Sequence, residues 1–196
     1  MTINTNFEEF FKKVVLCLKN SKITYVIVGG ISVIKYGRPR LTVDIDVVIE
    51  KHEAKIDQLS KCLQNNGFDY GIDDIHIALE EESLATILHS NFPYKLDIQG
   101  AYTIISRNAL ENRIYQEVFE TEDTKAFLQK PEDLIIAKLS YAGGHTDRNQ
   151  DFEDAKSVLL RQFKHLNMQY LNDLAFKTGL KNDLEYLCNE VKKLQK

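Results

Sequence analysis

Two short apolar runs, the first ending in a glycine pair and the second carrying two aspartates, constrain the fold of this chain most. The first run covers residues 25–28 and is followed by glycines at 29–30, a pattern typical of a strand that ends in a tight turn. The second run covers residues 41–49 and contains Asp44 and Asp46. The segment therefore predicts two strands that bring a phosphate-binding turn close to paired carboxylates.

The two aspartates are expected on one face of their strand, because side chains alternate along a strand. The same alternation directs Val43, Ile45 and Val47 to the opposite, core-facing side. Two carboxylates on one face repel each other unless a cation lies between them. Mg²⁺ prefers oxygen ligands of this kind and completes its shell with substrate phosphates, so the segment indicates a metal and nucleotide site. The alternative is a solvated strand face without a ligand.

The order of helical and strand-like apolar periodicities predicts an α/β (α+β) fold with a mixed sheet flanked by helices. Helices are expected over residues 7–18, 31–36, 52–66, 131–142, 152–163, 168–177 and 181–194, and strands over 25–28, 41–49, 75–79 and 94–98, with an edge strand within 119–128. Residues 80–90 fit neither pattern. Because the chain is helical throughout after residue 129, we expect an α/β core over residues 1–129 and a C-terminal helical region over 130–196.

The composition fits one domain, or a catalytic domain with a helical extension. The chain has 196 residues, of which 43% are hydrophobic, enough for a real core. No apolar run reaches the length of a transmembrane span, and the N-terminus lacks the pattern of a secretory signal, so we expect no membrane association. The net charge of −4 gives no global attraction to nucleic acid, although a local basic groove around Lys35, Arg38 and Arg40 remains compatible with it.

The three cysteines, Cys17, Cys62 and Cys188, are widely spaced and odd in number. This pattern fits reduced, buried thiols better than a disulfide framework or a zinc site. Cys17 and Cys62 both lie among helix-like apolar residues, where cysteine behaves as a small hydrophobic side chain. A cytoplasmic location is therefore expected.

Asp97 is the third acidic residue of interest, because it lies within the strand-like run 94–98. If this strand neighbours the one that bears Asp44 and Asp46, the three carboxylates can meet around one or two metal ions, as in-line phosphoryl chemistry requires. Asp97 is then also placed to take the proton from an attacking hydroxyl. The alternative is an ion pair of Asp97 with Lys95 or Arg107.

Three other features are compatible with phosphate binding. Glycines at 29–30 allow backbone N–H groups to approach phosphate oxygens at the start of a helix, where Ser32 can cap the helix or donate to a phosphate. Lys138, on an otherwise apolar helix, can reach a triphosphate as a point charge, or can simply be an exposed lysine. The P-loop and dinucleotide-binding glycine patterns are both absent.

These motifs resemble the nucleotidyltransferase superfamily typified by DNA polymerase β. The resemblance rests on Gly29-Gly30, a spacer of thirteen residues, and Asp44-Ile45-Asp46-Val47. The stretch Arg40-x-Thr42-x-Asp44-x-Asp46 is similar to the branch that contains the AbiEii toxins of type IV toxin–antitoxin systems. The downstream segments 131–139 and 148–154, the latter beginning with Arg148, add to the similarity with this branch, and Gln150 departs from it at a position where lysine is frequent.

The resemblance covers residues 25–160 and implies a role for each matching position. It implies Asp44, Asp46 and Asp97 as catalytic metal ligands, and Gly29, Gly30, Ser32, Arg40, Thr42, Lys138 and Asp151 as nucleotide-binding residues. The implied cofactor is Mg²⁺, with Mn²⁺ as an alternative.

The resemblance implies a nucleotidyltransferase that moves a nucleoside monophosphate from an NTP to an acceptor hydroxyl, with pyrophosphate as the product. Similarity to AbiEii favours RNA, especially tRNA, or a protein as the acceptor, and a cognate antitoxin as a partner. Two alternatives stay open. One is a small-molecule nucleotidyltransferase of the aminoglycoside-modifying type, and the other is a non-catalytic, nucleotide-binding antitoxin or regulatory module.

Overall fold

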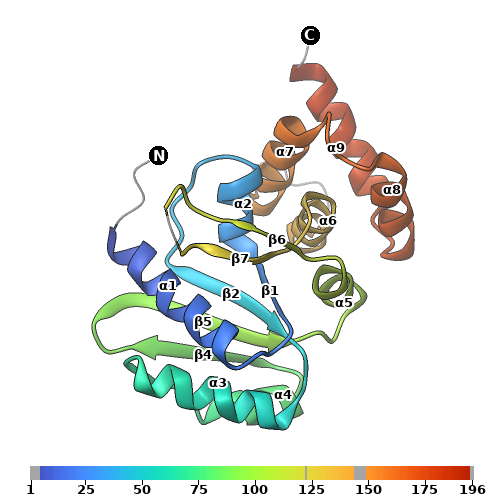
Figure 1. The fold of residues 1–196 in the computed structure, drawn as a ribbon. Helices are drawn as coiled ribbons and strands as arrows, with labels where there is room; N and C mark the ends of the chain where they lie inside the picture. Colours follow the sequence, from blue (N-terminus) through green and yellow to red (C-terminus); the bar gives the residue numbers. More distant parts are fainter. Residues whose placement is uncertain (1–4, 122, 144–148, 195–196) are drawn as a thin grey trace.

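A mixed β-sheet forms the centre of the fold in the computed structural model, which describes residues 5–121, 123–143 and 149–194 (Figure 1). Within these residues the sheet has seven strands in the order β3-β4-β5-β2-β1-β7-β6. The strands are β1 (Tyr25–Val28), β2 (Asp44–Ile49), β3 (Phe68–Tyr70), β4 (Leu84–His89), β5 (Phe92–Gly100), β6 (Ile114–Glu117) and β7 (Lys125–Leu128). The predicted α/β class with a mixed sheet is confirmed.

Helices cover both faces of this sheet and continue beyond it. They are α1 (Thr5–Asn20), α2 (Gly29–Tyr36), α3 (Glu53–Asn65), α4 (Asp74–Glu80), α5 (Ile104–Glu111), α6 (Pro131–Ala142), α7 (Gln150–Gln162), α8 (Met168–Lys177) and α9 (Lys181–Leu194). Among the described residues, none of these helices combines the length and apolar character needed to cross a bilayer.

The two faces of the sheet differ in what covers them. Ile27, Ile45 and Ile98 point into the main core, which α1 and α3 close on that side. The neighbouring residues point to the other face, where Val26 and Val48 pack against α5 in a small second cluster. Because successive side chains of a strand alternate, the aspartates of β2 lie on this second face. We call it the carboxylate face.

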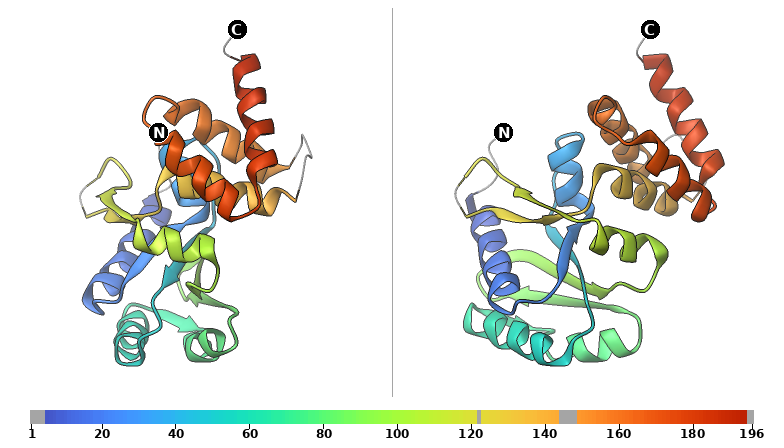
Figure 2. Two further views of the ribbon diagram at one scale, coloured as in Figure 1. Left: turned by 90° about the vertical axis from the view of Figure 1, so that its right-hand side faces the viewer. Right: turned by 45° about the vertical axis from the view of Figure 1, so that its right-hand side comes forward.

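The carboxyl-terminal helices gather at one end of the molecule, away from α3 and α4 (Figure 2). Helix α6 follows β7 after two residues, and it packs against α7 and α8 as well as against α5 and α2. Pro131 occupies the first turn of α6 and Gly143, with φ of +64°, ends it, the conformation that a C-cap glycine favours. The division of the chain at residue 129 stays a prediction.

Several helices and strands lie where the periodicity places them. The structure confirms the helices at α1, α3, α6, α7, α8 and α9, and the strands at β1 and β5. Helix α2 begins at Gly29 rather than at Ile31, so the glycine pair forms the first turn of the helix instead of a separate turn. This places the backbone N–H groups of both glycines at the helix N-terminus.

Three predictions about the sheet are wrong, and one unassigned segment proves to be a strand. Residues 75–79 form most of α4, not a strand, and Ile75, Ala78 and Leu79 pack into the main core at helical spacing. The aspartate strand begins at Asp44 rather than at residue 41, which leaves Val43 53% exposed instead of core-facing. Residues 125–128 form β7, an inner strand, because β6 pairs outside it. The unassigned residues 80–90 contain β4.

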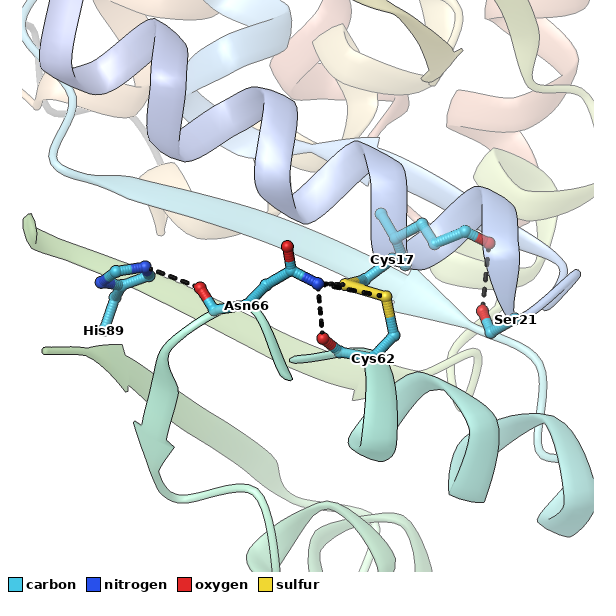
Figure 3. Close-up of a disulfide and its surroundings, with 6 residues drawn as sticks. Cys17, Ser21, Cys62, Asn66 and His89 are labelled. Atoms are coloured by element: carbon cyan, nitrogen blue, oxygen red, sulfur yellow. Dashed lines mark hydrogen bonds between the residues drawn. A yellow bond between two sulfur atoms is a disulfide. The ribbon is translucent and has the colours of Figure 1, made fainter. Parts of the chain in front are cut away.

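The structure also corrects the prediction of reduced cysteines, because it pairs Cys17 of α1 with Cys62 of α3 in a disulfide (Figure 3). The two helices pack side by side, which brings the Cα atoms to 5.3 Å across 45 residues of sequence, a separation that suits a disulfide. The Asn66 amide donates to the Cys62 carbonyl at 2.8 Å beside the bond. Cys188 is the free cysteine. The expected cytoplasmic location therefore loses its support from the cysteines.

We expect the disulfide to stabilise the protein by about 2–4 kcal/mol, because it restricts the unfolded chain over a loop of this length. Urea unfolding with and without a phosphine reductant measures the difference, and the double variant Cys17→Ser/Cys62→Ser should match the reduced protein. The matched control is Cys188→Ser, which should respond to reductant as the wild type does. Equal unfolding midpoints in oxidised and reduced samples would contradict the disulfide.

Candidate active site

Three carboxylates from two neighbouring strands meet on the carboxylate face. Asp44 and Asp46 come from β2 and Asp97 from β5, and one carboxylate oxygen of each lies within 4.8 Å of the others. The parallel pairing of the two strands places Asp46 directly opposite Asp97. Asp97 is only 8% exposed. Three oxygen ligands this close suit one or two hard divalent cations.

The pKa of Asp46 is raised by its position in this triad. Burial, and to a smaller extent the negative charges of Asp44 and Asp97, raise the pKa of its carboxyl to about 6. The Gly30 N–H and the positive charge of Lys138 act in the opposite direction. Without a bound cation, Asp46 therefore keeps its proton up to about pH 6, well above the range of an ordinary carboxyl. A cation between the carboxylates would remove this repulsion.

Two threonine hydroxyls orient the outer members of the triad. The Thr42 hydroxyl donates to Oδ1 of Asp44 at 2.8 Å, and the Thr86 hydroxyl of β4 donates to Oδ1 of Asp97 at 2.7 Å. Each carboxylate keeps its second oxygen for another ligand. The structure thus gives Thr42 a contact with a carboxylate, whereas the resemblance implies a contact with the nucleotide.

The glycine pair is required by the close approach of helix α2 to the triad. Gly29 has φ of +64°, and a Cβ at this position would lie 2.1 Å from Oδ2 of Asp46. A Cβ on Gly30 would lie 2.6 Å from the Thr42 hydroxyl. Only glycine combines this backbone conformation with the absence of a side chain. The Gly30 N–H in the first turn of α2 donates to Asp46, so this helix terminus already holds an anionic group.

A cluster of basic side chains borders the triad and is held by a buried aspartate. Asp154 of α7 is fully buried, and its oxygens accept from Nε of Arg38 at 2.8 Å and from an Nη atom of Arg40 at 2.6 Å. Lys138 of α6 pairs with Asp151 at 2.7 Å and lies 3.8 Å from Asp154. This cluster fixes α7 against α6 and against the segment that precedes β2.

A cavity of about 460 Å³ extends from the triad along the carboxylate face. Asp46 and Lys138 line it near the triad, and the rest of the wall comes from β1, β2, β5, α5 and α6, from the first residue of α2 and from the segment between β5 and α5. Gln129, between β7 and α6, also lines it. A cavity of this volume is within the range of small-ligand sites.

The structure brings most of the proposed site residues together, but not Ser32. Asp44, Asp46, Asp97, Gly29, Gly30 and Thr42 adjoin one another, and Arg40, Lys138 and Asp151 lie in the neighbouring basic cluster. The Ser32 side chain is fully buried and donates to the Ile27 carbonyl at 3.2 Å, so it lies apart from the triad, and its contact with a phosphate stays a prediction. Arg148 lies outside the described residues.

The alternative explanations for two residues are not supported by the contacts. Lys138 is 9% exposed and ion-paired rather than solvated. Asp97 accepts from Thr86, and among the ion pairs of the described residues it has none with Lys95 or Arg107.

Sequence reasoning missed Thr86 and Gln129. Thr86 lies in the stretch that fitted neither periodicity, and nothing in its neighbours signals that β4 would pair with β5. The sequence pattern indicates Gln129 only as the boundary between the predicted α/β core and the helical region. Asp154 belonged to a recognised segment, but its burial depends on the packing of three separate segments.

Comparison with known proteins adds to this geometry. A family model described as "Nucleotidyltransferase of unknown function (DUF6036)" matches residues 5–193. No protein with a curated description matches the chain by sequence.

Solved structures resemble the chain at low sequence identity. The solution structure of the antibiotic-resistance factor ANT(2'')-Ia has a TM-score of 0.56 and 13% identity over 98% of both chains. The same factor in complex with adenylyl-2''-tobramycin has a TM-score of 0.57 and 14% identity, covering 87% of this chain and 96% of that chain. An antigenic nucleotidyltransferase-like protein from Paracoccidioides brasiliensis has a TM-score of 0.52 and 20% identity, covering 91% and 92%. These likenesses show a shared fold.

The raised pKa of Asp46 predicts that Asp46→Asn stabilises the metal-free protein. With a folded-state pKa of about 6 against 3.8 for an unperturbed carboxyl, the folded protein binds more protons than the unfolded chain between these values. The free energy of unfolding therefore falls as the pH rises through this window. At pH above about 7, Asp46→Asn should raise it by on the order of 3 kcal/mol, and near pH 4 by little.

Chemical denaturation in EDTA at several pH values checks this prediction. The control is Asp173→Asn, an exposed aspartate on α8, which should change the free energy of unfolding little at any pH. A pH-independent difference between Asp46→Asn and the wild type would show that the ionisation of a buried Asp46 is not its cause.

Proposed function

We propose that this chain, which is a nucleotidyltransferase of the DUF6036 family, moves a nucleoside monophosphate from an NTP to an acceptor hydroxyl. The observation that carries the proposal is the triad, in which three carboxylate oxygens lie within 4.8 Å of one another beside a glycine helix terminus. Metal-assisted phosphoryl chemistry requires this combination of clustered acidic ligands and phosphate-binding backbone.

We propose Mg²⁺ as the cofactor, with Asp44, Asp46 and Asp97 as its ligands. Three carboxylates offer only oxygen, which hard divalent cations prefer. The raised pKa of Asp46 supports this, because burial and the two neighbouring carboxylates disfavour its negative charge, which a bound cation would stabilise. When bound, such ions neutralise the triphosphate and polarise its phosphoryl oxygens.

The residues of the chain fit distinct parts of the reaction. Asp97 takes the proton of the acceptor hydroxyl, whose oxygen forms a bond to the α-phosphorus while the bond from that phosphorus to the bridging α–β oxygen breaks. Pyrophosphate leaves with the electron pair of that bond. The N–H groups of Gly29 and Gly30 and the ammonium of Lys138 stabilise the phosphates electrostatically.

Arg40 and Asp151 are proposed members of the nucleotide site because each forms an ion pair in the basic cluster beside the triad. Asp151 holds the Lys138 ammonium at 2.7 Å, and Arg40 shares Asp154 with Arg38. Two of these cations therefore depend on α7 for their position, which supports the role of the Asp151 segment in nucleotide binding.

The open part of the carboxylate face is the proposed approach for the acceptor. Beyond Asp97, the strands β4 and β3 expose Leu84, Leu88 and Tyr70 on this side, with exposed fractions of 52%, 41% and 65%. An exposed apolar surface beside a reacting group suits a broad partner better than a small enclosed molecule. This supports a macromolecular acceptor, either RNA such as tRNA or a protein.

A macromolecular acceptor is consistent with the AbiEii-like motifs, so we propose that the enzyme acts as the toxin of a type IV toxin–antitoxin pair with a cognate antitoxin. The second candidate is a small-molecule nucleotidyltransferase, which the fold shared with ANT(2'')-Ia favours. The remaining alternative, a non-catalytic nucleotide-binding module, would show metal-dependent NTP binding without turnover.

Transfer is tested with each α-labelled NTP and Mg²⁺, with and without tRNA. The wild type should label an acceptor and Asp46→Asn should not. Asp97→Asn should lower kcat by about 10²–10⁴ while NTP binding persists, because it removes the proton acceptor. Asp173→Asn should retain the wild-type rate. A folded wild type that labels no RNA, protein or small molecule would overturn the proposal.

The toxin role is tested by regulated expression in bacteria. We expect growth arrest with the wild type and normal growth with Asp46→Asn at equal protein levels, because arrest requires transfer. Co-expression of a neighbouring antitoxin gene should restore growth. Resistance to an aminoglycoside without arrest would instead support the small-molecule candidate.

A further inference from the structure

Gln129 presents a buried hydrogen-bond donor to the cavity beside the triad. Its side chain is 1% exposed and lines the cavity. Within the described part of the chain, its Nε2 atom has no hydrogen-bond partner. A buried amide donor without a partner is unfavourable in a folded protein. A ligand that accepts a hydrogen bond at this position would satisfy it.

The backbone holds Gln129 in this place. Its N–H donates to the Ile27 carbonyl at 3.2 Å, which continues the pairing of β7 with β1. Helix α6 begins two residues later at Pro131. With both neighbouring segments fixed, the amide belongs to a rigid wall of the cavity.

The remaining wall is suited to an uncharged, flat group. Val48, Ala109 and Leu134 supply apolar surface, and Tyr102 and Tyr141 supply aromatic rings. The Tyr102 ring lies over Gly100, where a Cβ would come within 2.4 Å of it, and its hydroxyl donates to the Leu79 carbonyl at 3.2 Å. Aromatic and apolar walls with a few polar groups are typical of sites for planar heterocycles.

The charged side chains of the described lining mark one end of the cavity. Among the described residues that line it, Asp46 is the one carboxylate and Lys138 the one cation, and both belong to the proposed catalytic end. A polycationic acceptor would find no second carboxylate here, and a phosphate would find no second cation. The distant end therefore suits a neutral group that is attached to a charged one.

We propose that this cavity binds the nucleoside of the NTP, with Gln129 donating to an acceptor atom of its base or ribose. The proposal rests on the proposed function, because the triphosphate then lies at the end marked by Asp46 and Lys138. Gln129 is then a specificity-determining residue, because it contacts the nucleoside part of the NTP and not the reacting phosphate.

Calorimetric binding of non-reactive α,β-methylene analogues of ATP, GTP, CTP and UTP, with Mg²⁺, tests this assignment in Gln129→Met. This change keeps the length of the side chain and removes the donor. Affinity for the analogues should fall about tenfold, the loss of ~1.4 kcal/mol of binding free energy, whereas the affinity for inorganic tripolyphosphate should stay unchanged. The matched control is Gln64→Met, on an exposed position of α3, which should bind as the wild type does.

A thermal melt separates this role from a structural one. Because Gln129→Met removes an unpaired buried donor, its Tm should equal or exceed that of the wild type, whereas a glutamine needed for packing would lower it. An unequal loss among the four analogues would support a contact with the base, and an equal loss a contact with the ribose. Both support the nucleoside assignment.

Two results would overturn the inference in distinguishable ways. If the wild type binds the analogues and Gln129→Met binds them equally well, the cavity does not hold the nucleoside and the proposed function stands. An altered KM for the acceptor with unchanged analogue affinity would assign the cavity to the acceptor instead. If the wild type binds no analogue in the presence of Mg²⁺, the proposed function fails together with the inference.

Discussion

The parallel pairing of β2 with β5 is the constraint on which the candidate site depends. It places Asp46 beside Asp97. Asp44, two residues before Asp46, lies on the same face, so three negative charges share one small region. The fold tolerates this arrangement at the cost of a raised pKa for Asp46. A protein optimised only for stability would separate like charges. Their retention is understandable if a cation and a triphosphate belong between them.

The surroundings of the triad follow from the same requirement for close approach. Helix α2 begins so near to Asp46 that Gly29 has room for no side chain, and the Gly30 N–H donates to the Asp46 carboxylate. On the other side, α6 and α7 bring Lys138 within reach, held by Asp151 and by the buried Asp154. Arg38, Arg40 and Lys138 compensate the negative charge of the buried Asp154, without which its burial would be costly. The positive border of the site is thus also what fastens α7 to the sheet.

Local patterns were sufficient wherever one face of an element is buried and the other is solvated. Helices α1, α8 and α9 have this character, and their apolar spacing located them directly. The prediction of a strand at residues 75–79 is wrong because a short run of alternating apolar and polar residues fits a single helical turn as well as a strand. Only the packing of this segment in the main core decides between the two structures. The disulfide was missed for a similar reason. Cys17 and Cys62 are 45 residues apart, and no local pattern reports that their helices touch.

The sequence by itself determined the identity of the reactive groups. Gly29 and Gly30 before an apolar helix, and Asp44 and Asp46 on one face of a strand, follow from spacing that is short enough to survive any tertiary arrangement. The tertiary structure alone decided which distant groups join them, because strand pairing and helix packing act between residues far apart in the chain. It brought Thr86 to Asp97 and Asp154 to the arginines, it withdrew Ser32 into the core, and it placed the unpaired amide of Gln129 in the wall of a cavity.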